Sequence, residues 1–146
     1  MQLGKFTDYG LRVLVHLATI APERTTASAV ARLFGLSEHH VAKICSRLVQ
    51  GGLLVSARGR NGGLALARPA EEITLGDAAR CLAEQTALVE CFGGGPCDCL
   101  ILPACGLRAP LAKAQEAFYA ALDGHSLAEA VRPHAGALAE LFSEAD

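Results

Sequence analysis

The sequence lacks any long uninterrupted apolar run, although 51% of its 146 residues are hydrophobic. Arg, Glu, His or Gly breaks each apolar stretch well before the roughly 20 residues that a membrane span needs. A charged and then apolar leader with a small-residue cleavage site is also missing. We therefore expect a soluble, cytoplasmic protein, whose length suits one compact core or one small domain with a helical extension.

Catalytic motifs are missing as well. The chain has no Cys-x-x-Cys redox motif, no glycine-rich nucleotide loop and no plausible grouping of His with carboxylates. These absences argue against a thiol oxidoreductase, a ferredoxin-like electron carrier or another enzyme. We predict that the protein is not an enzyme.

Acidic residues are scarce in the first half of the chain and basic residues in the second. Residues 1–68 contain nine Lys or Arg and three Asp or Glu, a net charge of +6, whereas residues 69–146 contain four and twelve, a net charge of −8. A basic surface binds phosphates through counterion release, and an acidic surface does not. The asymmetry predicts a DNA contact in the N-terminal part; the alternative is a chance clustering of solvated charges.

Three helices are expected in this basic half. The spacing of Leu11, Leu14 and Leu17 predicts a first helix from Thr7, with the carboxylate of Asp8 in its first turn. Two further helices follow and form a helix-turn-helix pattern: one begins after a cap at residue 25 or 26 and ends at residue 35, and the next runs from a cap at residue 37 to about residue 50. From the third helix we expect DNA contacts by Ser37, His39, His40, Lys43 and Arg47.

A β-hairpin is expected directly after these helices. Apolar residues at 53–55 and 64–66 flank a glycine-rich tip at residues 58–63, as two short strands flank a turn. Arginines on such a tip suit a narrow minor groove or the phosphate backbone, so we expect DNA contacts by Arg58, Arg60 and Asn61. The alternative is a solvated hairpin tip. The predicted fold class is mainly α with a small β wing: a winged helix-turn-helix plus a long dimerisation helix.

The second half is expected to supply the dimer contact. Thr74 caps a fourth helix to about Glu84, and Pro110 opens a long helix to about Asp123. A narrow apolar seam, typical of a homodimer interface, consists of Leu107, Leu111, Ala114, Phe118 and Leu122. A capping box at Ser126 predicts one last helix. We expect a DNA-binding domain at 1–68, a connecting helix and cysteine loop at 69–109, and the dimerisation and C-terminal helices at 110–146.

Six cysteines in a chain without a leader need an explanation other than a secreted disulfide framework. Cys45 and Cys81 lie in helical apolar patterns and are expected to be buried. The other four fall within fifteen residues rich in Gly and Pro: Cys91, Cys97, Cys99 and Cys105. Thiols at this density suit a soft metal, zinc or an iron–sulfur cluster, and the lack of two paired knuckles disfavours zinc. A redox disulfide stays open.

Four segments carry a family resemblance: LGKFTDYGLRVLVHLA near the start, RGRNGGLALARP in the wing, ITLGD, and CLILPACGLR after the glycine loop. Together they resemble the winged-helix iron–sulfur transcriptional repressors, and within them most closely the nitric-oxide-sensing repressors. The resemblance covers nearly the whole chain. It implies a homodimeric repressor on a double-stranded DNA operator, with loss or nitrosylation of the cluster releasing the DNA.

The resemblance also implies a ligand set. The family uses three cysteines, and the last two are separated by five residues, as Cys99 and Cys105 are here. Cys91 is then the first ligand, with Cys97 as the alternative to Cys99. The family's fourth ligand is an aspartate of the partner subunit, at the position that Asp8 matches, although Asp8 is equally explained as a helix-dipole acid. A 4Fe–4S cluster is favoured by the resemblance, a 2Fe–2S cluster stays open, and so does an iron- or cluster-status sensor of the same family.

Overall fold

The computed structural model describes residues 3–59, 62–83 and 87–144. Its helices and strands follow the chain in the order α1 (Lys5–Ile20), α2 (Ala27–Phe34), α3 (Glu38–Gln50), β1 (Leu54–Ala57), β2 (Gly63–Leu66), α4 (Leu75–Leu82), α5 (Arg108–Asp123), α6 (Leu127–Val131) and α7 (Ala135–Glu144). This mainly helical architecture with one two-stranded sheet confirms the predicted fold class. No helix of the described residues is long and apolar enough to cross a membrane.

Side-chain caps define the helix-turn-helix. Thr26 accepts a hydrogen bond from the Ala29 N–H at the start of α2. Gly35 ends α2 in the left-handed conformation, at φ +62°, which glycine adopts at little cost. Ser37 then caps α3 by accepting from the His40 N–H. These local signals are readable from sequence, and the predicted second and third helices are confirmed.

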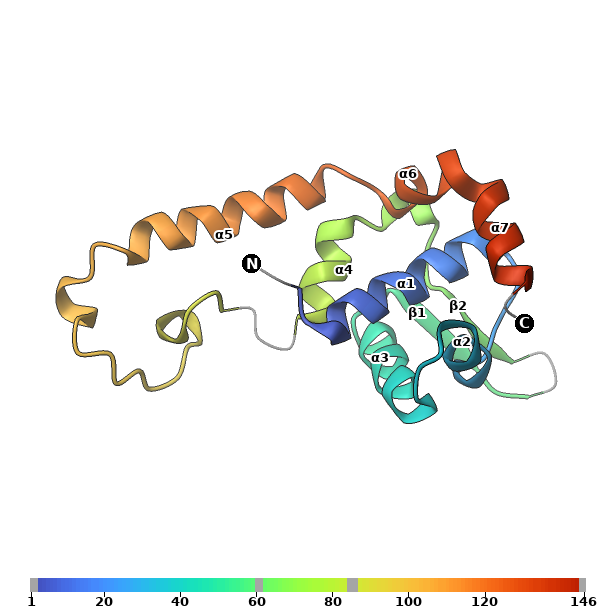
Figure 1. Ribbon diagram of the computed structural model, residues 1–146, viewed down its shortest axis with the longest axis horizontal. Coiled ribbons are helices and arrows are strands. Elements are labelled where there is room, and N and C mark those ends of the chain that lie inside the picture. The colour runs from blue at the N-terminus through green and yellow to red at the C-terminus, as the bar shows by residue number, and fades with distance from the viewer. Residues whose placement is uncertain (1–2, 60–61, 84–86, 145–146) are drawn as a thin grey trace.

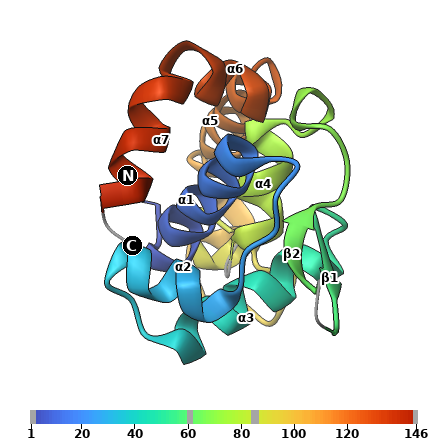
Figure 2. The same ribbon diagram turned by 90° about the vertical axis from the view of Figure 1, so that its right-hand side faces the viewer.

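The wing is an antiparallel pair in which Leu54 faces Leu66 and Ala57 faces Gly63. Thr25, ahead of α2, forms a bridge with Leu64 and so joins the wing to the helix-turn-helix. In Figures 1 and 2, α3 lies on the opposite side of the molecule from α6. The predicted hairpin is confirmed, while its tip residues Arg60 and Asn61 lie outside the described residues.

The core lies around α1, which contacts α3, α4, α6, α7 and β2. The largest fully buried side chains come from α1, α3, the start of β1, the chain before α4, α4 and α6: Leu14, Leu17, Ile44, Leu48, Leu53, Leu54, Ile73, Leu82 and Leu127. Each removes apolar surface from water, worth roughly 1.5–3 kcal/mol per side chain. The helix-turn-helix and the wing therefore share one core with α4 and α6.

Residues 87–107 lie away from this core at one end of the molecule, and α5 runs from that end back toward α4 (Figure 1). Helix α5 begins at Arg108, two residues before the expected Pro110. The expected capping box at Ser126 is confirmed, but the helix that it starts is not the last: α6 ends at Val131, a 3₁₀ turn follows, and α7 begins at Ala135. Pro133 explains the break, because it has no N–H to donate to the helical hydrogen-bond ladder.

Candidate nucleic-acid interface and metal centre

Helix α3, from which DNA contacts are expected and which is called the recognition helix below, has one buried and one exposed face. Val41, Ile44 and Leu48 are fully buried against the core. His39 and Lys43 are exposed on the other side, and the Ser37 hydroxyl at the start of the helix is occupied as a cap. An exposed cationic helix face of this kind suits the major groove of DNA.

His40 has a packing contact in addition to its expected role on DNA. Its ring stacks on Phe6, with 5.9 Å between ring centroids, and meets the edge of Tyr9 at 5.6 Å. The side chain is half-buried, so it joins the start of α3 to the start of α1. The sequence did not reveal this contact, because more than thirty residues separate the partners.

Arg47 has a structural contact in addition to its expected role on DNA. Its Nε donates to the carbonyl oxygen of Cys81 at 2.8 Å, and the Cys81 thiol lies 3.5 Å from the Arg47 carbonyl oxygen. Because Cys81 lies in the last turn of α4, Arg47 ties the recognition helix to that helix. An Arg47 substitution therefore perturbs the packing of α3 on α4, whether or not Arg47 also contacts DNA as expected.

Arg24, beside the wing, is a further exposed cation that the sequence does not indicate as a DNA contact. Arg58 is exposed at the end of β1 as expected. Arg24, also exposed, donates from Nη1 to the Gly63 carbonyl oxygen at 3.4 Å and so lies beside the wing. Nothing local in the sequence marks Arg24, since the contact spans 39 residues.

The four clustered cysteines lie in the segment between α4 and α5. Cys91 lies in a short 3₁₀ turn, Cys105 follows another, and both are half-buried, as is Cys97, whereas Cys99 is exposed. All four thiols are free, so the donor set fits a soft metal or an iron–sulfur cluster. Within the described part of one chain, however, no three His, Cys, Asp or Glu side chains are gathered closely enough to share a metal ion.

Asp8 lies apart from these cysteines in the sequence and has its own partner. Its carboxylate accepts from Arg12 Nη2 at 2.6 Å and from Nε at 3.3 Å, one helical turn along α1. The Arg12 guanidinium also lies over the Tyr9 ring, 5.5 Å from its centroid. In the single chain Asp8 therefore acts as the helix-dipole acid and ion-pair partner that the sequence left as its alternative role.

The two remaining cysteines belong to the packed interior. Cys45 is 4% exposed, and burial raises the pKa of its thiol to about 11. Cys81 is half-buried, and desolvation likewise raises the pKa of its thiol. Both therefore stay protonated at neutral pH, unlike the thiolates that bind metals. The expected burial is confirmed for Cys45 and partial for Cys81.

Comparison with known proteins identifies the family. Residues 3–133 match the Rrf2 family, described as iron-dependent transcriptional regulators. The chain belongs to the Rrf2 family. It is 40% identical over 136 residues to the HTH-type transcriptional regulator NsrR of Geobacillus kaustophilus, covering 92% of each chain. It is 39% identical over 132 residues to Protein aau3 of Rhizobium meliloti, covering 90% of this chain and 86% of that one.

A solved structure agrees with the family assignment. CymR, the global cysteine regulator of B. subtilis, superposes with a TM-score of 0.67 at 27% identity, over 88% of this chain and 95% of that one. The resemblance to winged-helix repressors is thus confirmed, and this Rrf2 protein is a DNA-binding transcriptional regulator, not an enzyme. Because relatives include a cysteine regulator, family membership alone does not fix the signal.

The Rrf2 assignment makes Lys43 a direct test of the interface. Lys43→Ala should weaken operator binding and, for a phosphate contact, reduce the slope of log affinity against log salt by about 0.9. Fluorescence anisotropy over a salt series measures both quantities. Lys113→Ala, an exposed lysine on α5, is the matched control and should bind like the wild type. Equal effects of the two substitutions would place the interface elsewhere.

Proposed function

We propose that this Rrf2 regulator is a homodimeric repressor that senses nitric oxide through an iron–sulfur cluster and then leaves its operator. The carrying observation is the set of four free thiols within fifteen residues, between α4 and α5. The 40% identity to NsrR over nearly the whole chain supports it. Cys45, the cysteine of the DNA-binding unit, does not compete as a cluster ligand, because it is buried and its thiol stays protonated.

The proposed ligands are Cys91, Cys99, Cys105 and Asp8 of the partner subunit, with Cys97 as the alternative to Cys99. A cluster bound there would supply iron atoms that bind a small diatomic molecule. The chain's own contribution is to hold three thiolates on one segment and to present Asp8 from the start of the partner's α1. Asp8 must then exchange or share its contact with Arg12, so ligand binding and the start of α1 are linked.

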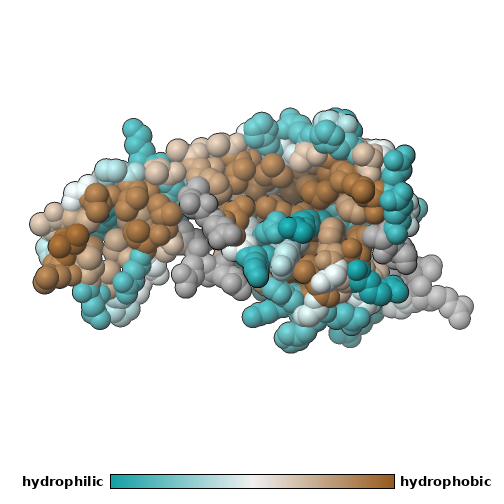
Figure 3. Space-filling model, in the orientation of Figure 1, coloured by the Kyte–Doolittle hydropathy of each residue, from teal (hydrophilic) through white to brown (hydrophobic). Residues whose placement is uncertain are grey.

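The proposed dimer interface is the apolar side of α5 and the adjoining segment. In the described chain α5 has no buried residue, and Leu100, Ile101 and Leu107 are 93%, 56% and 63% exposed. Hydrophobic residues gather at the end of the molecule where α5 begins, on the left in Figure 3. Large apolar patches on a small soluble chain are typical of protein interfaces, and a second copy of α5 would cover this one.

An iron- or cluster-status sensor of the same family is the second candidate. The family's description as iron-dependent favours it, and its ligand set would be the same. The two differ in the signal alone: an iron sensor releases DNA when iron is withdrawn and is indifferent to nitric oxide.

The cluster and the dimer can be tested together on protein purified without oxygen. We expect a dimer by sedimentation, broad visible absorbance, and iron with acid-labile sulfide in similar amounts. A chelator should release operator DNA slowly, after the absorbance has fallen. Prompt release by chelator would favour the iron sensor, whereas zinc without visible absorbance would contradict both candidates.

A further inference from the structure

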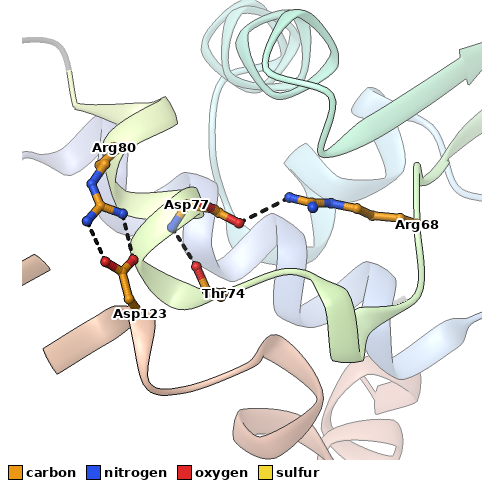
Figure 4. Close-up of polar contacts among 5 residues, drawn as sticks. All are labelled: Arg68, Thr74, Asp77, Arg80 and Asp123. Carbon is orange, nitrogen blue, oxygen red and sulfur yellow. Dashed lines mark hydrogen bonds and ion pairs between the residues drawn. The ribbon is translucent and has the colours of Figure 1, made fainter. Parts of the chain in front are cut away.

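The end of α5 is held against α4 by a two-pronged ion pair. Arg80 donates from Nη1 and Nη2 to the two carboxylate oxygens of Asp123, each at 2.6 Å (Figure 4). Two parallel hydrogen bonds fix the mutual orientation of the groups, as a single point contact would not. The pair thus restricts the angle between the two helices.

The surroundings of the pair are shaped to receive it. The Arg80 guanidinium lies over the Tyr119 ring of α5, 4.8 Å from its centroid. Gly76, in the first turn of α4, leaves room for the Asp123 carboxylate, which a Cβ at that position would overlap. The hydrogen bonds lower the pKa of Asp123 and raise that of Arg80, so the pair stays ionised at neutral pH.

Backbone hydrogen bonds also connect the start of α4 with the chain that follows α5. The Leu75 N–H donates to the His125 carbonyl oxygen at 2.9 Å, and the Leu127 N–H donates to the Ile73 carbonyl oxygen at 2.8 Å. These bonds hold the chain after α5 beside the chain before α4.

On its other side α4 is paired with the wing. Asp77 accepts from Arg68 Nη2 at 3.1 Å, and Arg68 lies just after β2 (Figure 4). The recognition helix is tied to the end of α4 by Arg47. Helix α4 therefore contacts both DNA-binding elements and α5, and in the described residues it is the main partner of α5.

Helix α5 spans 16 residues, about 24 Å at the usual rise. If two copies pair along it, the tilt of each DNA-binding unit against α5 sets the distance between the two recognition helices. Two-fold regulators need that distance to match half-sites about one helical turn, roughly 34 Å, apart. A small change in the angle between α4 and α5 would therefore lower the affinity for DNA with two half-sites, but not for DNA with one.

We propose that Arg80 and Asp123 are positioning residues for DNA binding, which fix the angle between α5 and the DNA-binding unit and so match the dimer to its half-site spacing. The inference rests on the proposed dimer through α5. It assigns to two residues outside the DNA interface and the cysteine segment a role in operator choice.

The test compares two DNA duplexes. The first carries the two-half-site sequence that the wild type selects from random DNA, and the second has one half scrambled. Arg80→Gln and Asp123→Asn should each lose about tenfold in affinity for the first duplex, in the usual range of coupling effects, with unchanged affinity for the second. The double variant should lose no more than either single one, because both substitutions break the same pair.

Two further variants serve as a second test and as a control. Gly76→Ala should reproduce the loss, since its Cβ displaces Asp123 without removing a charge. Arg132→Gln breaks an equally short exposed pair, Arg132 to Glu71 at 2.6 Å, that does not touch α5, and it should bind both duplexes like the wild type. Thermal unfolding and sedimentation check that each variant is folded and dimeric.

Different results overturn different claims. Suppose that the wild type is dimeric and prefers the two-half-site duplex. If the Arg80, Asp123 and Gly76 variants then behave like Arg132→Gln, or lose affinity for both duplexes equally, the positioning role is wrong. A monomeric wild type, or one that binds both duplexes equally, would contradict the proposed dimer and the positioning role with it.

Discussion

Cys91→Ala, Cys99→Ala and Cys105→Ala should each abolish cluster assembly and, with it, regulated binding to the operator. Each removes one of the three proposed thiolate ligands, and a carboxylate is a harder and weaker ligand for iron than the lost sulfur. Absorbance spectra and iron analysis of protein purified without oxygen measure the loss. The effect should be complete rather than graded, because a cluster with two cysteine ligands and one carboxylate is poorly held.

Cys97→Ala decides between the two candidate middle ligands. Retained absorbance would assign that role to Cys99, and total loss would move it to Cys97 or indicate an all-cysteine site. Cys81→Ala is the matched control, because it keeps the carbonyl oxygen that accepts from Arg47. Cys45→Ala should retain the cluster as well but lower the free energy of unfolding by roughly 1 kcal/mol, since it empties part of the core. Loss of the cluster in either control would contradict the proposed ligand set.

The DNA-binding unit could be predicted because its signals are local. The caps at Thr26 and Ser37 and the glycine at residue 35 act within four residues of themselves, and the alternation that marks the wing is equally short in range. The break between α6 and α7 at Pro133 also has a local cause. The capping box at Ser126 predicts where a helix begins but not how long it is, so the sequence indicated one last helix.

The contacts between elements could not be predicted. The contacts of His40 with Phe6, of Arg47 with Cys81 and of Arg80 with Asp123 each join residues more than thirty positions apart. Charge and periodicity place such residues on a surface but do not choose their partners. All three contacts were therefore absent from the expectations, in which His40 and Arg47 contacted DNA alone.

The cysteine segment shows the same limit for a different reason. Its residue types indicate a soft-metal site, but none of the four cysteines is fully buried, so hydrophobic packing does not bring the thiols together. The proposed site would require a bound cluster and a second subunit to gather its ligands. The ligand set thus stays a prediction.

Nitric oxide, added without oxygen to the cluster-loaded dimer, should release operator DNA as the visible absorbance bleaches. The measurement follows the absorbance and the anisotropy of labelled operator in the same titration, with a parallel titration of the Cys105→Ala variant. We expect the two wild-type signals to change together at sub-stoichiometric to few-fold nitric oxide, and no response of the variant. Bleaching without release of DNA, or binding that ignores nitric oxide while an iron chelator promptly abolishes it, would contradict nitric oxide sensing.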